Sequence, residues 1–219
     1  MARKRLRGSM RALVMPLVAG FWLQAACVGR DTALENWSEF VGLIPGFLGN
    51  HLRRAFLGFT TAQCDPSASI GFGTLFSKSE VRIEAGVYIG ARCQIALAHL
   101  ERDAMLAPGV QVTSGPYTHG TEDGTRPIRD QPGALRCVRL GQGCWIGSAA
   151  VVMADVGAES VVGAGSVVSR PLPIGVVAVG VPARVIRVRR GLMNTAAPPP
   201  AVCGSGGGPV GRVDSSPHL

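Results

Sequence analysis

A single histidine is the best candidate for catalysis in this sequence. His119 lies in a stretch rich in glycine and polar residues, Ser114-Gly-Pro-Tyr-Thr-His-Gly-Thr-Glu-Asp-Gly124, that has no regular hydrophobic pattern. The other three fall in an amphipathic segment, at the corner of a repeat and near the C-terminus (His51, His99 and His218). A neutral imidazole can take a proton from an alcohol near pH 7, so His119 is predicted to be a general base. The acidic pair 122–123 could orient its second ring nitrogen or simply be solvated.

Basic side chains gather at two places that predict different partners. The formal net charge is +8. One group follows the last repeat and is predicted to bind a phosphate group (Arg184, Arg187, Arg189 and Arg190). The other, Arg3-Lys4-Arg5-Leu6-Arg7, indicates a membrane-facing or targeting segment. The basic residues form no single stripe with interleaved aromatics, so no nucleic-acid partner is predicted.

The cysteines give no metal-binding signal. None of the six forms a Cys-x-x-Cys pair, so neither a zinc site nor a redox motif is predicted, and no metal is expected. Cys93 and Cys144 fall at a small, inward position of repeats, where a cysteine acts as a small hydrophobic side chain. The remaining cysteines have no spacing that pairs them (Cys27, Cys64, Cys137 and Cys203).

Aliphatic residues recur about every six positions, and this interval predicts the architecture that must position the histidine. The longest run is Ile83, Ile89, Ile95, Leu100, Leu106 and Val112. Neither a helix nor a simple strand has this period, whereas hexapeptide repeats build a parallel β-helix in which three hexads complete one triangular coil. The aliphatic residue fills the interior, the glycine next to it is expected to permit the corner dihedral angles, and the fifth residue must be small. A composition of 47% hydrophobic but only 5% aromatic residues fits such a core.

Two segments are expected before the repeats. Residues 1–30 are basic and then apolar, as in a signal peptide or a short anchor. The alternatives are a hydrophobic N-terminal helix and a true start further downstream, at Met10 or Met15. Residues 31–60 have apolar residues at three- and four-residue spacing, broken at Pro45, which predicts an amphipathic helix pair with Arg53 and Arg54 on its polar face. Such a pair could cap the open end of the β-helix, lie in a bilayer interface, or do both.

The repeats are expected over residues 61–190, with one interruption. Between Thr113 and Arg136 the aliphatic period stops, which predicts a loop extruded from the solenoid and carrying function. Residues 191–219 are rich in proline, glycine and serine and are predicted to be a disordered tail.

Four segments in this order resemble a known family. They are Arg126-Pro-Ile-Arg-Asp-Gln131, Gly143-Cys-Trp-Ile-Gly-Ser148, Val162-Gly-Ala-Gly-Ser-Val-Val168 and Gly180-Val-Pro-Ala-Arg-Val-Ile-Arg187. Over roughly residues 43–190 the chain resembles the hexapeptide-repeat O-acetyltransferases, which include the maltose, galactoside and exopolysaccharide acetyltransferases. The resemblance implies an all-β, left-handed parallel β-helix that forms a homotrimer. It also implies transfer of an acetyl group from acetyl-CoA to a hydroxyl of a sugar or polysaccharide precursor.

The resemblance assigns roles to particular residues. His119 would act as the base in a direct transfer without a covalent acyl-enzyme. Trp145 and Ser148 would line the pantetheine channel, and Ala164 would contact it through its backbone. The nucleotide end would meet Ser169, Arg170 and Arg187. Because acetyl-CoA is cytosolic, the enzyme is expected in the cytoplasm, with its N-terminal segment as the candidate for contact with the inner face of the membrane.

The sequence departs from the family pattern in three ways and leaves two alternatives. Tyr117 stands where relatives often have the first histidine of a His-x-His pair, and the coil from Val152 to Val156 is two residues short. No asparagine-bearing segment for the sugar is recognised before Leu106, which leaves the acceptor open.

The alternatives are a non-catalytic scaffold or binding protein, and a trimeric zinc hydratase of the carbonic anhydrase type. The hydratase needs three converging histidines, and only His99 and His119 are candidates.

Overall fold

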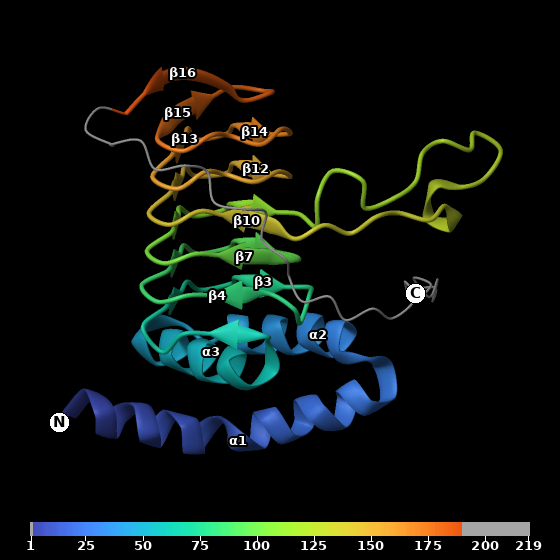
Figure 1. The fold of residues 1–219 in the computed structure, drawn as a ribbon. Coiled ribbons are helices and arrows are strands. Elements are labelled where there is room, and N and C mark those ends of the chain that lie inside the picture. The colour runs from blue at the N-terminus through green and yellow to red at the C-terminus, as the bar shows by residue number, and fades with distance from the viewer. Residues whose placement is uncertain (1, 190–219) are drawn as a thin grey trace.

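The fold is a helical cap followed by a parallel β-solenoid. The computed structural model describes residues 2–189, with side chains described from residue 12 onward. Three helices precede the strands, namely α1 (Ala2–Val28), α2 (Arg30–Gly42) and α3 (Gly46–Thr60), and a short 3-10 helix η1 (Ile128–Asp130) lies within the loop. Figure 1 shows the helices stacked below the coils and the loop projecting from one side. The predicted tail, residues 191–219, lies outside the described residues.

Three sheets form the three faces of the solenoid, and successive coils stack short parallel strands on these faces. Sheet A contains β1 (Gln63–Cys64), β4 (Arg82–Ile83), β7 (Ala98–Leu100) and β10 (Val138–Leu140). Sheet B contains β2 (Ser69–Ile70), β5 (Tyr88–Ile89), β8 (Met105–Leu106), β11 (Trp145–Ile146), β13 (Val161–Val162), β15 (Val176–Val179) and the antiparallel end strand β16 (Arg184–Val188). Sheet C contains β3 (Leu75–Phe76), β6 (Gln94–Ile95), β9 (Gln111–Val112), β12 (Val151–Val152) and β14 (Val167–Val168). The predicted parallel β-helix is therefore confirmed, including the N-terminal helical segment and the extruded loop.

The hexad positions fill the interior as the sequence predicts. Ile83, Ile89 and Leu106 are completely buried, and the other aliphatic residues of the run are at most 2% exposed. The small fifth position is also inside, where Cys93 and Cys144 are fully buried and burial raises the pKa of both thiols, that of Cys144 to about 12. No single coil could bury these side chains alone, so the core exists only because the coils stack.

The glycine that follows the aliphatic residue has a different role from the one predicted. A Cβ atom on Gly90 would lie 2.6 Å from the backbone nitrogen of Pro108, and one on Gly147 would lie 2.5 Å from that of Ala164. The left-handed backbone falls two residues later, with φ of 56° at both Arg92 and Ala149. These glycines therefore allow close approach of the next coil, and they do not set the corner dihedral angles.

The helical cap supplies hydrogen bonds that the first coil cannot obtain from another coil. Carbonyl groups on each coil accept from N–H groups of the coil below, so the first coil has unpartnered carbonyls. The Nε of Arg53 donates to the carbonyl of Ile70 at 3.0 Å, and the Oγ of Ser38 donates to that of Phe76 at 3.3 Å. Arg53 also donates to Ile44 at 2.6 Å and is only 3% exposed. The prediction that Arg53 lies on a polar outer face is wrong, because these carbonyls need a buried donor.

Helix α2 is tied to the first coil by a carboxylate. The Oδ1 of Asp31 accepts from the backbone nitrogen and the hydroxyl of Ser79, both at 2.8 Å, and its Oδ2 pairs with Lys78 at 3.1 Å. Burial alone would raise the pKa of Asp31, but these hydrogen bonds and the lysine charge outweigh it and lower that pKa.

Helix α1 packs against the other two helices and closes the bottom of the cap. Val14 and Phe21 are fully buried, and Phe21 meets Phe56 of α3 edge-on at 5.8 Å between ring centroids. Within the described part of the chain, no helix is both apolar enough and long enough to cross a membrane.

The described cysteines differ in one respect from the sequence prediction. Cys27, Cys64, Cys93 and Cys144 are free thiols, whereas Cys137 takes part in a disulfide bond that no spacing in the sequence indicated.

Candidate functional site

The extruded loop carries His119 and connects β9 of sheet C to β10 of sheet A. Its two ends run side by side, because the backbone nitrogen of Arg136 donates to Ser114 at 2.8 Å and that of Ala134 donates to Tyr117 at 2.7 Å. The outer part then extends well beyond the solenoid (Figure 1). The predicted placement of His119 on an extruded loop is therefore correct.

Gln131 holds the outer part of this loop together. Its Nε2 donates to the carbonyls of Asp123 at 2.7 Å and Arg126 at 3.0 Å, and its Oε1 accepts from the backbone nitrogen of Asp123 at 3.0 Å. The side chain is only 8% exposed, although it lies in a loop. Gln131 is the last residue of the Arg126–Gln131 motif, and the geometry gives that motif a physical role as the internal support of the loop.

A groove of about 500 Å³ lies where the loop, sheet C and α2 meet. Thr118 and His119 line it from the loop, and Leu135 lies on the returning strand of the loop. The outer surface of sheet C contributes Gln94 and Gln111, which are partners in the register of β6 and β9. Helix α2 contributes the two carboxylates of Glu35 and Glu39. The groove therefore combines an imidazole with amide and carboxylate groups that can bind hydroxyls.

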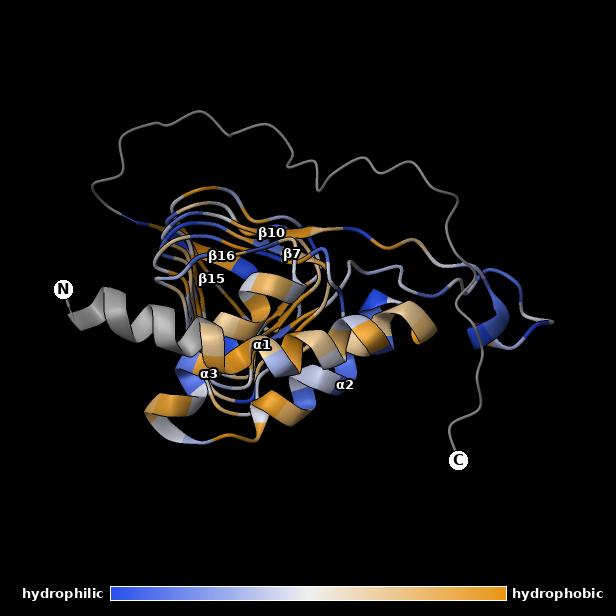
Figure 2. Ribbon diagram, turned by 90° about the horizontal axis from the view of Figure 1, so that it is seen from below, coloured by the Kyte–Doolittle hydropathy of each residue, from blue (hydrophilic) through white to orange (hydrophobic). Residues whose placement is uncertain are grey.

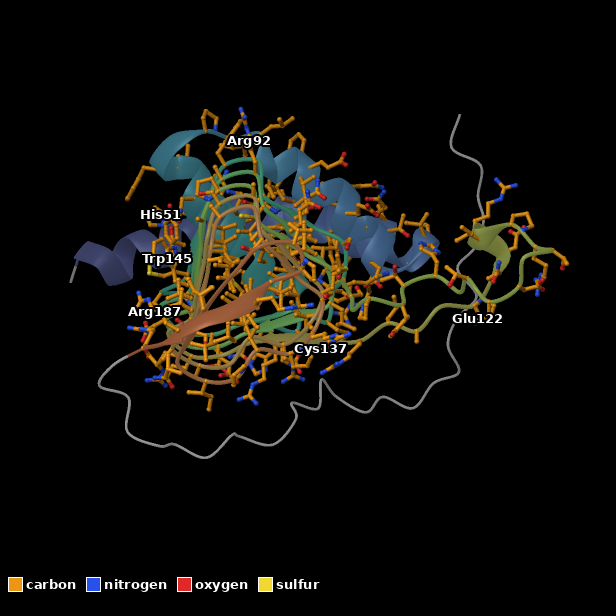
Figure 3. All side chains as sticks on the ribbon, turned by 90° about the horizontal axis from the view of Figure 1, so that it is seen from above. His51, Arg92, Glu122, Cys137, Trp145 and Arg187 are labelled. Carbon is orange, nitrogen blue, oxygen red and sulfur yellow. The ribbon has the colours of Figure 1, made fainter. Side chains whose placement is uncertain are left out.

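The imidazole of His119 is exposed, and its environment leaves both ring nitrogens open to a substrate. Among residues 12–189, no side chain or backbone group forms a hydrogen bond or ion pair with it. Asp123 does not orient the ring, since its carboxylate accepts from the backbone nitrogen and hydroxyl of Thr125 at 2.9 and 2.6 Å. These bonds lower the pKa of Asp123. Glu122 lies on the exposed outer part of the loop (Figure 3).

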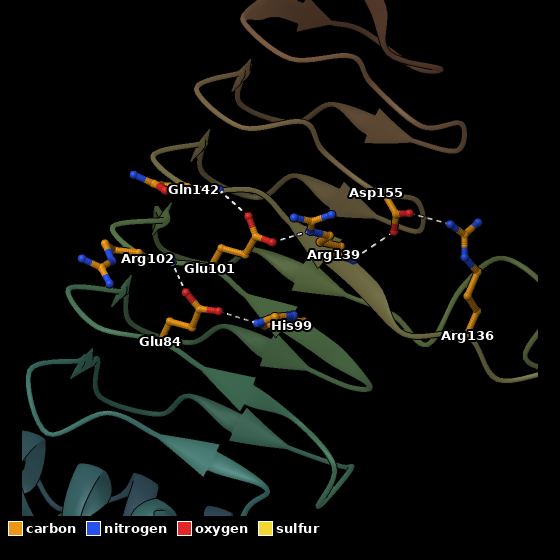
Figure 4. Close-up of polar contacts among 8 residues, drawn as sticks. All are labelled: Glu84, His99, Glu101, Arg102, Arg136, Arg139, Gln142 and Asp155. Atoms are coloured by element: carbon orange, nitrogen blue, oxygen red, sulfur yellow. Dashed lines mark hydrogen bonds and ion pairs between the residues drawn. The ribbon is translucent and has the colours of Figure 1, made fainter. Parts of the chain in front are cut away.

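A ladder of charges on sheet A fixes His99 and the root of the loop (Figure 4). The Nε2 of His99 lies 2.8 Å from Glu84, so this histidine is hydrogen-bonded as predicted, but it lies within strand β7 and not at the corner of a repeat. Further along the ladder, Glu101 pairs with Arg139. Asp155 then binds Arg136 at 2.5 Å, which anchors the returning strand of the loop to the next coil.

The residues assigned to coenzyme A by resemblance do not all lie together in one chain. Ser148 and Ala164 lie on successive coils at the corner between sheets B and C, where the backbone nitrogen of Gly165 donates to Ser148 at 2.8 Å. Trp145 and Arg187 are exposed on sheet B. Ser169 and Arg170 follow β14 and lie at the corner between sheets C and A, which is also the corner from which the loop leaves.

Trp145 and the loop face opposite sides of the solenoid. In Figure 3 Trp145 and Arg187 lie on one side of the coils and Glu122, in the loop, lies on the other. Trp145 is 51% exposed, in register with Met105 and Tyr88, which are 48% and 45% exposed on the neighbouring strands. One chain therefore presents an apolar row and a histidine loop that do not reach each other.

Sequence reasoning missed the acidic and amide groups of the groove. Gln94 and Gln111 stand directly before buried aliphatic residues, so their outward direction on one face could have been derived from the hexad period. Glu35 and Glu39 carry no such signal, because only the docking of α2 on the first coil brings them to the groove. No group of three or more histidine, cysteine, aspartate or glutamate side chains in the described residues is arranged to hold a metal ion.

Comparisons with known proteins agree with this architecture. Residues 137–170 match the family model described as the hexapeptide repeat of succinyl-transferase. Galactoside O-acetyltransferase of Escherichia coli (strain K12) is 50% identical over 52 residues, which cover 23% of this chain and 26% of that protein. The chain thus aligns with about a quarter of the length of this curated relative.

Solved structures extend the likeness over most of the chain. A maltose O-acetyltransferase from Clostridium difficile 630 has a TM-score of 0.61 at 19% identity, covering 73% of this chain and 88% of that one. A galactoside acetyltransferase in complex with coenzyme A has a TM-score of 0.59 at 21% identity, covering 73% and 78%. A hexapeptide-repeat acetyltransferase from Vibrio cholerae O1 biovar eltor, complexed with acetyl coenzyme A, has a TM-score of 0.53 at 19% identity, covering 72% and 87%.

The fold and the repeats define the class as hexapeptide-repeat β-solenoids with a helical cap. Residues 137–170 carry hexapeptide repeats, and the maltose and galactoside O-acetyltransferases are among the proteins to which the chain is similar.

Proposed function

We propose that this protein is an acetyl-CoA-dependent O-acetyltransferase that acts on a hydroxyl of a sugar or polysaccharide precursor. The observation that carries the proposal is the groove of about 500 Å³ that is lined by His119, by the amides of sheet C and by the carboxylates of α2. Sugars are recognised through arrays of hydroxyl groups, for which amide and carboxylate side chains are suitable hydrogen-bond partners. The names of the similar proteins, which include acetyltransferases complexed with coenzyme A, support the donor.

The proposed reaction is a direct transfer in a ternary complex. His119 accepts the proton of the attacking hydroxyl as its oxygen bonds to the thioester carbonyl carbon. Backbone N–H groups of the groove stabilise the resulting oxyanion. The C–S bond then breaks, the acetyl ester forms, and the protonated imidazole returns its proton to the coenzyme A thiolate. A thioester is already an activated donor, so no covalent acyl-enzyme is needed.

The opposite placement of the loop and of Trp145 favours a site shared between subunits. In a cyclic homotrimer the loop of one subunit would reach toward sheet B of its neighbour, where Trp145 and Arg187 are exposed. The pantetheine chain would then run along Trp145, Ser148 and the backbone of Ala164. The nucleotide end would meet the cations of Arg170 and Arg187 beside Ser169, which suit a 3′-phosphate. An apolar row as exposed as Tyr88, Met105 and Trp145 is consistent with a surface that a partner covers.

The site of action that we propose is the cytoplasm. Acetyl-CoA is a cytosolic metabolite, so the groove must open to the compartment that holds it. The need for acetyl-CoA therefore argues against export of the protein, and the N-terminal helix is proposed to serve a purpose other than export.

An acceptor screen tests the proposal. The full chain is incubated with acetyl-CoA and a panel of mono- and oligosaccharides, and release of the coenzyme A thiol is followed together with the mass of the acetylated product. The proposal predicts transfer to at least one sugar hydroxyl by the wild type and a loss of about 10²–10⁴-fold in His119→Ala. Sugar binding without transfer would support the scaffold alternative, and metal-dependent hydration of CO₂ would support the hydratase alternative.

A further inference from the structure

Helix α1 has an outer face that is unusual for the surface of a water-soluble domain. From Ala12 to Val28 its only polar side chain is Gln24. The inner face is buried through Val14, Val18 and Phe21. Leu23 on the outer face is nevertheless 74% exposed and Leu13 is 56% exposed. A surface helix ordinarily places charged residues opposite its buried stripe, and α1 places none there over these residues.

The apolar character continues next to α1. Leu43 and Phe47, at the turn between α2 and α3, are 71% and 72% exposed. Figure 2 shows hydrophobic colouring along α1 and at this turn when the molecule is viewed from below. A set of exposed apolar side chains thus lies at the capped end of the solenoid, which we call the basal face and define by Leu13, Leu23, Leu43 and Phe47.

Positive charge lies at one end of the same helix. Five basic residues occur within the first eleven of the chain, and α1 begins at Ala2. The first turn of α1 contains no acidic residue. The indole of Trp22, 45% exposed, lies where α1 approaches α2, with the guanidinium of Arg30 5.5 Å from its ring centroid. A basic segment, an interfacial tryptophan and an uncharged apolar face are the features of a helix that lies in a membrane interface.

We infer that the basal face binds the surface of an anionic phospholipid bilayer, with α1 lying in the interfacial plane. The basic residues provide attraction to lipid headgroups, and the apolar side chains enter the boundary between headgroups and acyl chains. The association is peripheral, because no helix in the described residues could span the bilayer. The inferred membrane site is separate from the proposed sugar groove, which lies between α2, sheet C and the loop, and from the proposed coenzyme A contacts on the solenoid.

Symmetry would strengthen this contact, a step that rests on the proposed homotrimer. In any cyclic trimer the same feature of each subunit lies at the same height along the symmetry axis. Three basal faces would therefore meet one membrane together, and the linked contacts would bind more tightly than one.

Vesicle binding tests the inference on the full chain without any substrate. Co-sedimentation is measured with phosphatidylcholine vesicles that contain phosphatidylglycerol and with pure phosphatidylcholine vesicles. The expected result is binding to the anionic vesicles that weakens at high salt. Replacement of Arg3, Lys4, Arg5 and Arg7 by glutamine should lower the partition coefficient roughly 10²–10³-fold, since each basic residue near the surface contributes.

A pair of substitutions at one exposed position separates membrane contact from folding. Leu23→Glu should lower binding to anionic vesicles by roughly 10²-fold, because burial of the apolar side chain is lost and a like charge is added. Leu23→Phe should retain binding. Ile186→Glu is the control away from the basal face: Ile186 is 60% exposed on β16 at the other end of the solenoid, and its change should leave vesicle binding unaltered. Circular dichroism and the melting temperature should be the same for all three, since both positions are exposed.

Two results would overturn the inference. Either the wild type stays in the supernatant with anionic vesicles, or Leu23→Glu binds them as well as the wild type does. In the first case, a halved mass of the soluble particle in Leu23→Glu would identify a second copy of this chain as the partner of the basal face. None of these results depends on acetyl transfer, so the inference and the proposed function can fail separately.

Discussion

Replacement of Gln131 by leucine should lower the rate of acetyl transfer without weakening the solenoid. The side chain makes three hydrogen bonds inside the loop, two to the carbonyls of Asp123 and Arg126 and one from the backbone nitrogen of Asp123. It makes none of these with a coil. His119 lies on the same loop, so its position over the groove depends on the order that Gln131 maintains.

The size of the effect follows from those three bonds. Each contributes about 0.5–1.5 kcal/mol net, or roughly 2–4 kcal/mol in total. Water can reach part of an exposed loop and replace some of this, so the lower end, about 2 kcal/mol, is the reasonable expectation. When the ordered and open forms of a loop are nearly equal in free energy, destabilising the ordered form by about 2 kcal/mol lowers its population by about 10–30-fold. We therefore expect kcat to fall by about 10–30-fold.

The assay compares kcat, coenzyme A affinity and melting temperature for four proteins. Gln131→Glu keeps the acceptor oxygen but loses both donated bonds, and it should fall between the wild type and Gln131→Leu. Gln142→Leu is the matched control, because Gln142 is an exposed glutamine on the solenoid. Unchanged kcat in Gln131→Leu would refute the reasoning, as would a loss of melting temperature equal to the loss expected for a core residue.

Much of the fold could be predicted because the signal is local and repeated. Each hexad contains its own inward aliphatic residue and its own small residue, so the recurrence of aliphatic residues from Ile83 to Val112 is enough to define a coil. What failed was reasoning about single residues whose role comes from a neighbouring coil. The constraint on Gly90 is the backbone nitrogen of Pro108 in the next coil, and no pattern within the hexad contains it.

The burial of Arg53 in the cap is a second case in which contact with a neighbouring element, and not the local sequence pattern, sets the role of a residue. Helical periodicity places an arginine outside by default, since charged side chains are rarely buried without partners. Here the first coil and the end of α2 leave carbonyls that require donors, and Arg53 supplies them from a buried position. The requirement arises only when helix and coil meet, so the sequence of α3 alone could not reveal it.

In the candidate site too, residues with a local sequence signal could be predicted, and residues brought in by contacts between distant elements could not. His119 was predictable because few histidines exist and only one lies in an unpatterned loop. The carboxylates of Glu35 and Glu39 were not, because they join the groove through the docking of α2 on sheet C. The coenzyme A residues were placed by resemblance, and their separation from the loop becomes apparent only in three dimensions.

The remaining predictions concern the base, the phosphate contact, the cap and its pH dependence. His119→Ala should lower kcat by about 10²–10⁴-fold with coenzyme A affinity unchanged, since only proton transfer is lost, and near wild-type turnover would exclude this base. Arg187→Ala should weaken coenzyme A binding by about 1–3 kcal/mol but dephospho-coenzyme A binding much less; equal losses in calorimetry would point to a folding or interface role. Arg53→Met should lower the free energy of unfolding by about 3–5 kcal/mol in urea titrations, because buried carbonyls lose their donor, whereas a change below about 1 kcal/mol would mean that water replaces it. The pKa of Asp31 is lowered from its ordinary value of 3.8, so its contribution to stability is present above that value and is lost as the pH falls through the lower folded value. Asp31→Asn should therefore lower the melting temperature at neutral pH and flatten its decline below about pH 4, where the wild type loses the same interaction. Parallel melting curves for the two proteins between pH 2 and about pH 7 would show that Ser79 and Lys78 do not stabilise the ionised form, and the tie between α2 and the first coil would have to come from packing alone.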